Sequence, residues 1–179
     1  MLDADQPTVT LTRIQSGVGA LTLSAACSAA VGDVRLGCAY QLACERSSLV
    51  QAASELTQAP AATRRPVIVA GRHRFETLTL DLAQVQDLER VVVYLYSASG
   101  QTLNWGGTLV IETFADARVE VPISRPPSGG TLVALSVYNV DGELVLRNED
   151  TLIRGPVRAA AAAFGFDRIS WLDDHTPLD

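Results

Sequence analysis

The segment Val91-Val92-Val93-Tyr94-Leu95-Tyr96 constrains the fold of this chain more than any other, because it is a continuous run of β-branched, aromatic and leucine side chains. Such a run is typical of a central β-strand that is covered by protein on both faces. It begins after Arg90 and ends at Ser97-Ala98-Ser99-Gly100, a small and polar sequence that favours a turn. We therefore expect a buried central strand over residues 91–96.

Segments on both sides of this run alternate apolar and polar residues or are short apolar stretches, and both patterns indicate strands. We expect them at Thr8–Ile14, Ala20–Ala26, Val34–Leu42, Leu49–Gln51, Val67–Val69, Phe75–Leu82, Leu109–Phe114, Arg118–Ile123, Thr131–Val140 and Leu144–Arg147. The Asp141-Gly142 pair predicts a tight hairpin between the last two. The pattern predicts a mostly β fold, a two-sheet antiparallel β-sandwich.

The two ends of the chain have patterns of their own. We expect Ser16-Gly17 to form the turn that joins the first two strands, and Gly155 to Gly165, which contains five consecutive alanines, to form one short C-terminal helix. The alternation after Gly165, up to Trp171, predicts a final strand. The expected organisation is an N-terminal strand and lead-in over 1–18, the sandwich domain over 19–173 and a flexible tail over 174–179.

The composition excludes some classes of function. The chain has 179 residues, of which 47% are hydrophobic and 19% are charged, and this balance predicts a folded domain. Its net charge of -6 disfavours nucleic-acid binding, which requires a basic surface. All 14 basic residues are arginine, so lysine chemistry is excluded. The cysteines Cys27, Cys38 and Cys44 have no metal-site spacing, and we expect free thiols in a cytoplasmic protein without a signal sequence.

The residues that usually carry catalysis are few. His73 and His175 have no partner at a spacing that indicates a triad or a metal site, so we expect both to lie in loops and predict no catalytic residues. A hydrolase that uses scattered acids, such as the adjacent pairs Glu149-Asp150 and Asp173-Asp174, is the least favoured alternative, because adjacent acids usually point to opposite sides of a strand or lie in solvent. We therefore expect a binding or assembly domain and no enzyme.

Several of these segments, taken in order, resemble the tellurium-resistance stress proteins with a TerD-like domain, and among them the TerA-type branch. The resemblance covers Gly19 to Asp173. It rests on Asp33-Val34-Arg35-Leu36-Gly37-Cys38 and the segment that follows it to Leu42, on Glu76 to Leu82 running on to Asp87–Tyr96, on Asn104-Trp105, and on the stretch from Phe164-Gly165-Phe166 to Trp171.

The resemblance implies a two-sheet β fold, calcium binding through aspartates, and a part in bacterial responses to tellurite and other stress, within protein assemblies at the inner surface of the membrane. This chain departs from the family at the calcium ligands. Arg35 stands where the family has the second aspartate of Asp-x-Asp, and Ala70-Gly71-Arg72-His73-Arg74 stands in place of an acidic loop. Only Asp33 remains, and one carboxylate cannot hold calcium. We therefore expect no cofactor and no metal.

Two site hypotheses follow. In the first, Arg35 with Arg72 or Arg74 forms an ion pair with Asp33 that replaces the charge balance of the metal; the alternative is that these arginines form a solvated face. In the second, Tyr94, Tyr96, Asn104 and Trp105 line a pocket, which would make the chain a small-ligand-binding β-sandwich. The preferred function is a non-enzymatic interaction or scaffold domain whose partners are other proteins of a stress-response assembly. The sequence predicts neither the partner nor the oligomeric state.

Overall fold

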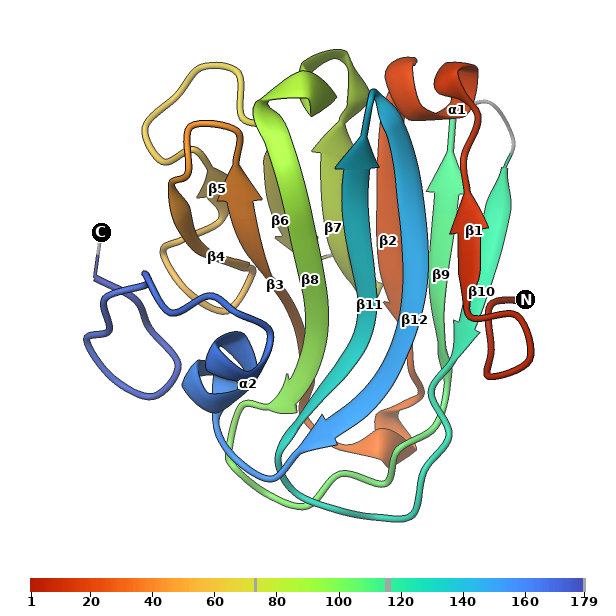
Figure 1. Ribbon diagram of the computed structural model, residues 1–179. Coiled ribbons are helices and arrows are strands. Elements are labelled where there is room, and N and C mark those ends of the chain that lie inside the picture. Colours follow the sequence, from red (N-terminus) through yellow and green to blue (C-terminus); the bar gives the residue numbers. More distant parts are fainter. Residues whose placement is uncertain (73, 115–116, 179) are drawn as a thin grey trace.

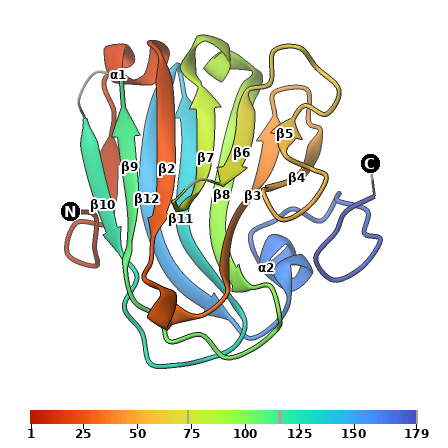
Figure 2. The same cartoon turned by 180° about the vertical axis from the view of Figure 1, so that it is seen from behind.

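The computed structural model describes residues 1–72, 74–114 and 117–178, which form two β-sheets packed face to face (Figures 1 and 2). Sheet A contains, in spatial order, β1 (Thr8–Thr10), β12 (Glu143–Ile153), β11 (Thr131–Val140), β8 (Leu88–Ser97), β3 (Val34–Leu42) and β4 (Ser47–Gln51). Sheet B contains β10 (Arg118–Pro122), β9 (Thr108–Thr113), β2 (Ala20–Ala26), β7 (Glu76–Asp81), β6 (Ile68–Arg72) and β5 (Gln58–Ala59). All of these strand pairs are antiparallel, so the expected two-sheet sandwich is confirmed.

The central strand β8 is buried on both faces, as its sequence predicted. Val91, Val93 and Leu95 face sheet B and belong to the core between the sheets. Tyr94 and Tyr96 point to the other face of sheet A, where they pack in a second cluster with residues of the C-terminal helix α2 (Val157–Ala163). Side chains alternate across a strand, so a strand covered on both sides needs apolar residues at every position.

The N-terminal segment differs from the expected strand over Thr8–Ile14. The strand β1 ends at Thr10, and the short helix α1 (Arg13–Gly17) follows where we expected a turn. Thr12 and Gln15 form a capping box, in which each side chain bonds the backbone N–H of the other residue. A Thr-x-x-Gln sequence is a known signal for a helix start. Since α1 intervenes, β1 pairs with β12, and β2 pairs with β7 and β9.

The C-terminal segment contains the expected helix but not the expected final strand. The helix α2 ends before Gly165, whose φ of +75° suits a helix end. After it, strand pairing within residues 166–178 is limited to an isolated bridge between Trp171 and Pro177. The expected flexible tail also makes defined contacts, because Asp174 O accepts a hydrogen bond from Arg158 N at 3.0 Å.

The hairpin expected at Asp141-Gly142 is present between β11 and β12. Both residues have positive φ, +52° and +83°, as a tight turn of this kind requires. Among the described residues, η1 (Ala29–Val31) and η2 (Leu82–Asp87) are 3-10 helical segments. Asp81 caps η2 by accepting a hydrogen bond from Ala83 N, which explains why the alternating pattern of β7 stops there.

Candidate functional site

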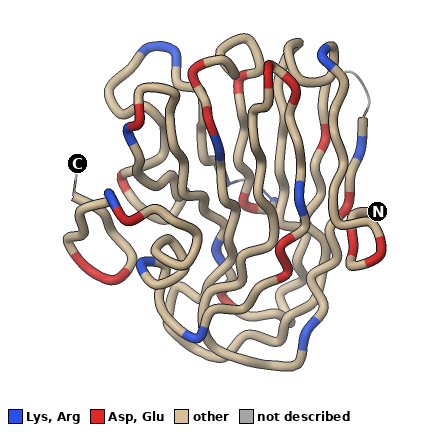
Figure 3. Tube along the Cα trace, in the orientation of Figure 1, with Lys and Arg blue, Asp and Glu red and all other residues tan. Residues whose placement is uncertain are grey.

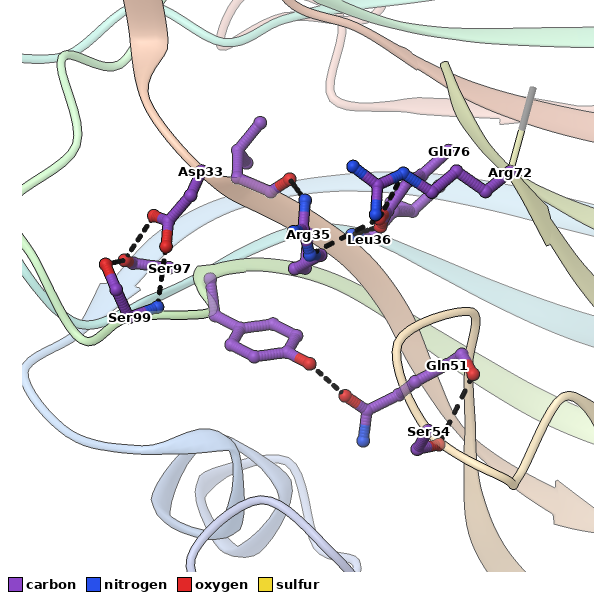
Figure 4. Close-up of polar contacts among 11 residues, drawn as sticks. Asp33, Arg35, Leu36, Gln51, Ser54, Arg72, Glu76, Ser97 and Ser99 are labelled. Carbon is purple, nitrogen blue, oxygen red and sulfur yellow. Dashed lines mark hydrogen bonds and ion pairs between the residues drawn. The ribbon is translucent and has the colours of Figure 1, made fainter. Parts of the chain in front are cut away.

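Asp33, the candidate centre of the first site hypothesis, lies just before β3 and binds hydroxyl and backbone donors. Its carboxylate accepts hydrogen bonds from Ser97 Oγ and Ser99 N, both at 2.6 Å (Figure 4). These bonds, that of Ser97 first, hold the pKa of Asp33 below its usual value, because they stabilise the charged form. No ion pair joins Asp33 to an arginine in the part of the chain that the structure describes, so the expected pair of Asp33 with Arg35, Arg72 or Arg74 is wrong.

The carboxylate that the arginines contact is Glu76, the first residue of β7. Arg35 Nε lies 3.6 Å from Glu76 Oε1, and Arg72 Nε lies 3.7 Å from the same oxygen (Figure 4). Arg72 is directly opposite Glu76 in the hairpin of β6 and β7, while Arg35 reaches it from β3 of the other sheet. The cluster of Arg35, Arg72 and Glu76 therefore connects the two sheets at one edge of the sandwich.

Glu76 is buried at this edge because a free backbone donor meets it. The pairing of β3 with β4 runs from Gln41 to Gly37, so Leu36 lies just beyond the last residue that has a partner in β4. Leu36 N donates to Glu76 Oε2 at 2.7 Å, and Glu76 is only 8% exposed. A buried N–H without a partner is costly, and here the carboxylate takes the place of the missing strand.

The second oxygen of Glu76 is held by charge alone. Oε1 is buried and has no hydrogen bond among the described residues, because 3.6 and 3.7 Å are too long for one. The two guanidinium groups therefore neutralise this oxygen as ion pairs. Arg35 is mostly buried, with 19% of its side chain exposed, whereas 59% of the Arg72 side chain is exposed.

The three arginines of the first hypothesis do share one place in the fold. Arg35, Arg72 and Arg74 all line a cavity of about 300 Å³. Arg74 lies with its guanidinium carbon 5.4 Å from the centre of the Phe75 ring. His73, between Arg72 and Arg74, falls outside the described residues. Asp33 is not among the residues that line this cavity.

Sequence reasoning missed Glu76 as a site residue, although a signal was present. Glu76, Leu78 and Leu80 alternate along one strand, so they share one face, and that face is the buried one. An acid in register with core leucines is an acid that must find a partner inside the protein.

The four residues of the second hypothesis do not line one pocket. Tyr94 and Tyr96 face α2, whereas Trp105 belongs to the core between the two sheets. Trp105 Nε1 donates to Ser128 Oγ at 2.8 Å, and the exposed Asn104 donates from Nδ2 to Ala30 O at 3.3 Å. The aromatic pocket is therefore wrong as it was predicted, because its residues lie on opposite faces of sheet A.

Tyr96 instead joins a network with the C-terminal segment. Its hydroxyl donates to Gln51 Oε1 at 2.5 Å, and Gln51 Nε2 donates to His175 O at 2.9 Å. The rings of Tyr96 and His175 are stacked, with their centres 5.3 Å apart, and both line a cavity of about 200 Å³. Burial, with a smaller effect of the Glu76 charge, raises the pKa of Tyr96 to about 12.

No model of a known protein family matches the chain, and no curated protein matches it. The resemblance to the tellurium-resistance family therefore stays a prediction from the sequence alone. Within residues 1–72, 74–114 and 117–178, no three His, Cys, Asp or Glu side chains are grouped as a metal site. No helix in the same residues is long and apolar enough to cross a membrane.

Proposed function

We propose that this chain is a non-enzymatic interaction domain that binds another protein through one end of the sandwich. Four large apolar side chains are exposed there: Ile14 (69%), Val18 (48%), Phe114 (75%) and Val140 (52%). We call these four residues the apolar end. Exposed apolar side chains that gather in one place are typical of protein-binding sites. This exposure is the observation that carries the proposal.

The segments that hold the apolar end are fixed to one another. Ser16 Oγ of α1 accepts a hydrogen bond from Leu144 N of β12 at 2.9 Å. Asn139 lies beside the β11–β12 turn, and its Nδ2 donates two hydrogen bonds. One goes to Val85 O in η2 at 2.9 Å, and the other goes to Leu88 O at the start of β8 at 3.0 Å. Phe114 packs over Gly19, where an added Cβ would lie 2.5 Å from Phe114 Cβ. A surface held in place in this way loses little entropy on binding.

The charges around the apolar end indicate the chemistry of the partner. Asp87 and Asp141 are exposed at this end, and Glu143 pairs with Arg13 at 3.7 Å. Figure 3 shows several acidic positions along the upper ends of the central strands. A partner surface with apolar side chains inside a basic rim would complement this arrangement.

The resemblance in sequence supports the biological setting of the proposal. It favours a partner within a bacterial stress-response assembly of the tellurium-resistance type, in the cytoplasm or at the inner membrane surface through that partner. The small-ligand-binding alternative no longer has its aromatic pocket, because Trp105 and the two tyrosines belong to different clusters.

Site-specific photocross-linking in the source cells tests this function. A cross-linking residue at position 14 or 114 should capture one discrete partner protein, whereas the same residue at Gln101, which is exposed outside the apolar end, should capture none. The double variant Ile14→Ser/Phe114→Ser should keep its melting temperature and lose at least about tenfold in affinity for that partner, as interface anchors do. Equal capture at position 101, or capture of only a second copy of this chain, would overturn the proposal.

A further inference from the structure

The cavity beside Glu76 is a feature of this chain that neither the predicted sites nor the apolar end explains. It is lined by residues of β2, η1, β3 and the β6–β7 hairpin, with a volume of about 300 Å³. This size is at the lower end of the range for small-molecule sites. Its lining includes Cys27, Arg35, Arg72, Arg74, Phe75 and Glu76.

The charge of the cavity lining is positive in a protein whose net charge is -6. Three guanidinium groups and one carboxylate belong to the described residues that line it. The carboxylate of Glu76 already accepts from Leu36 N and lies near two guanidinium groups, so it neutralises only part of their charge. A cation is disfavoured here by the same three arginines.

Most N–H donors of these guanidinium groups make no hydrogen bond to the described residues. Arg35 donates from Nη1 to Val34 O at 3.2 Å, and its Nε makes no hydrogen bond with Glu76. The guanidinium groups of Arg72 and Arg74 make no hydrogen bond to another described residue, and that of Arg74 lies near the Phe75 ring. Planar guanidinium groups bind phosphate and carboxylate oxygens through paired hydrogen bonds, and this is the chemistry such a set can perform.

Apolar side chains form another part of the cavity wall, beside the small polar Ser28. Ala25, Val34, Leu36 and Phe75 contribute to the lining. A bare inorganic anion would leave these side chains without contact, whereas an anion with an apolar body would cover them. We propose that this cavity binds a small organic anion, whose phosphate or carboxylate group contacts Arg35, Arg72 and Arg74 and whose apolar part lies against Phe75.

Titration calorimetry of the whole chain with three probes tests the proposal. Phenyl phosphate and benzoate carry the two anionic groups on the same apolar ring, and inorganic phosphate lacks the ring. At least one of the ring compounds should bind with one-to-one stoichiometry and more tightly than inorganic phosphate. The tighter of the two identifies the anionic group. Binding should weaken as the salt concentration rises, because the contact is ionic.

A matched pair of variants locates the binding. Arg72→Ala/Arg74→Ala removes two exposed arginines of the cavity and should weaken binding by at least about tenfold, since each charge-assisted hydrogen bond contributes strongly. Arg64→Ala/Arg154→Ala removes two exposed arginines elsewhere, with the same change in net charge, and should leave the affinity within about twofold.

Cys27 supplies an independent measurement, because it lines the cavity while Cys44 is exposed outside it. Phenyl phosphate or benzoate, whichever binds more tightly, should slow the alkylation of Cys27 by iodoacetamide and leave that of Cys44 unchanged. Three results would overturn the proposal: no binding of either ring compound, equal loss of affinity in the two double variants, or an unchanged alkylation rate at Cys27. None of them bears on the apolar end.

Discussion

Arg35 and Glu76 join the two sheets of the sandwich, with Arg35 Nε on β3 3.6 Å from Glu76 Oε1 on β7. The other oxygen of Glu76 accepts the backbone N–H of Leu36, the residue after Arg35, at 2.7 Å. The carboxylate of Glu76 thus binds the backbone at the start of β3, which β4 does not reach. The ion pair and the backbone bond have different energetic roles, which a single substitution can separate.

We predict that Glu76→Gln lowers the free energy of unfolding by about 2 kcal/mol. The amide oxygen still accepts from Leu36 N, but the mostly buried guanidinium of Arg35 loses its counter-charge. Urea denaturation followed by circular dichroism measures the change, with the slope of the transition expected to stay the same.

The control for this prediction is Glu112→Gln, which removes the pair with Arg118. Both side chains of that pair are about half exposed, at 52% and 53%, so the substitution should lower stability clearly less than Glu76→Gln does. Equal effects of the two substitutions would mean that the charge of Glu76 has no special role at the edge.

The fold followed from the sequence where one pattern ran through a whole element. The apolar run of β8 and the Asp141-Gly142 turn were sufficient to predict a strand buried on both faces and a tight hairpin, and both are confirmed. The start of the chain was harder, because Thr8 to Ile14 alternates like a strand, while the capping box of Thr12 and Gln15 begins a helix inside it. Local hydrogen bonding prevailed over the apolar pattern there.

The candidate site could be predicted only in part. The sequence identified the arginines Arg35, Arg72 and Arg74, which do line one cavity. It assigned them to Asp33, because it could not show that Ser97 and Ser99 would satisfy that carboxylate. It also placed Tyr94 with Trp105, although they lie on opposite faces of sheet A. Which residues from distant segments meet depends on sheet register, and a single sequence does not show the register.

The hydrogen bonds of Asp33 predict how stability depends on pH. The pKa of Asp33 in the folded protein lies below the ordinary value of 3.8, so its contribution to stability is present above that value. It is lost as the pH falls through the lower, folded-state pKa. Asp33→Asn should therefore be less stable than the wild type at about pH 7, and the difference should shrink below about pH 4. Urea midpoints at the two pH values measure it, and a difference that does not change with pH would contradict it.

The adjacent tyrosines of β8 offer a matched pair of substitutions on one face of sheet A. The hydroxyl of Tyr96 donates to Gln51 Oε1, whereas that of Tyr94 is buried without a hydrogen-bond partner among the described residues. Tyr96→Phe should lower the free energy of unfolding by about 1–2 kcal/mol, because it leaves Gln51 Oε1 without its donor in a residue that is 2% exposed.

Tyr94→Phe removes the same atom two residues earlier and should cost less than about 0.5 kcal/mol or increase stability, because a buried hydroxyl without a partner is itself unfavourable. Both rings remain in the cluster under α2, so the apolar area that each variant buries is nearly the same. Urea denaturation of the two variants and the wild type therefore isolates the bond between Tyr96 and Gln51. Equal losses in both variants would show that this bond does not stabilise the docking of the C-terminal segment.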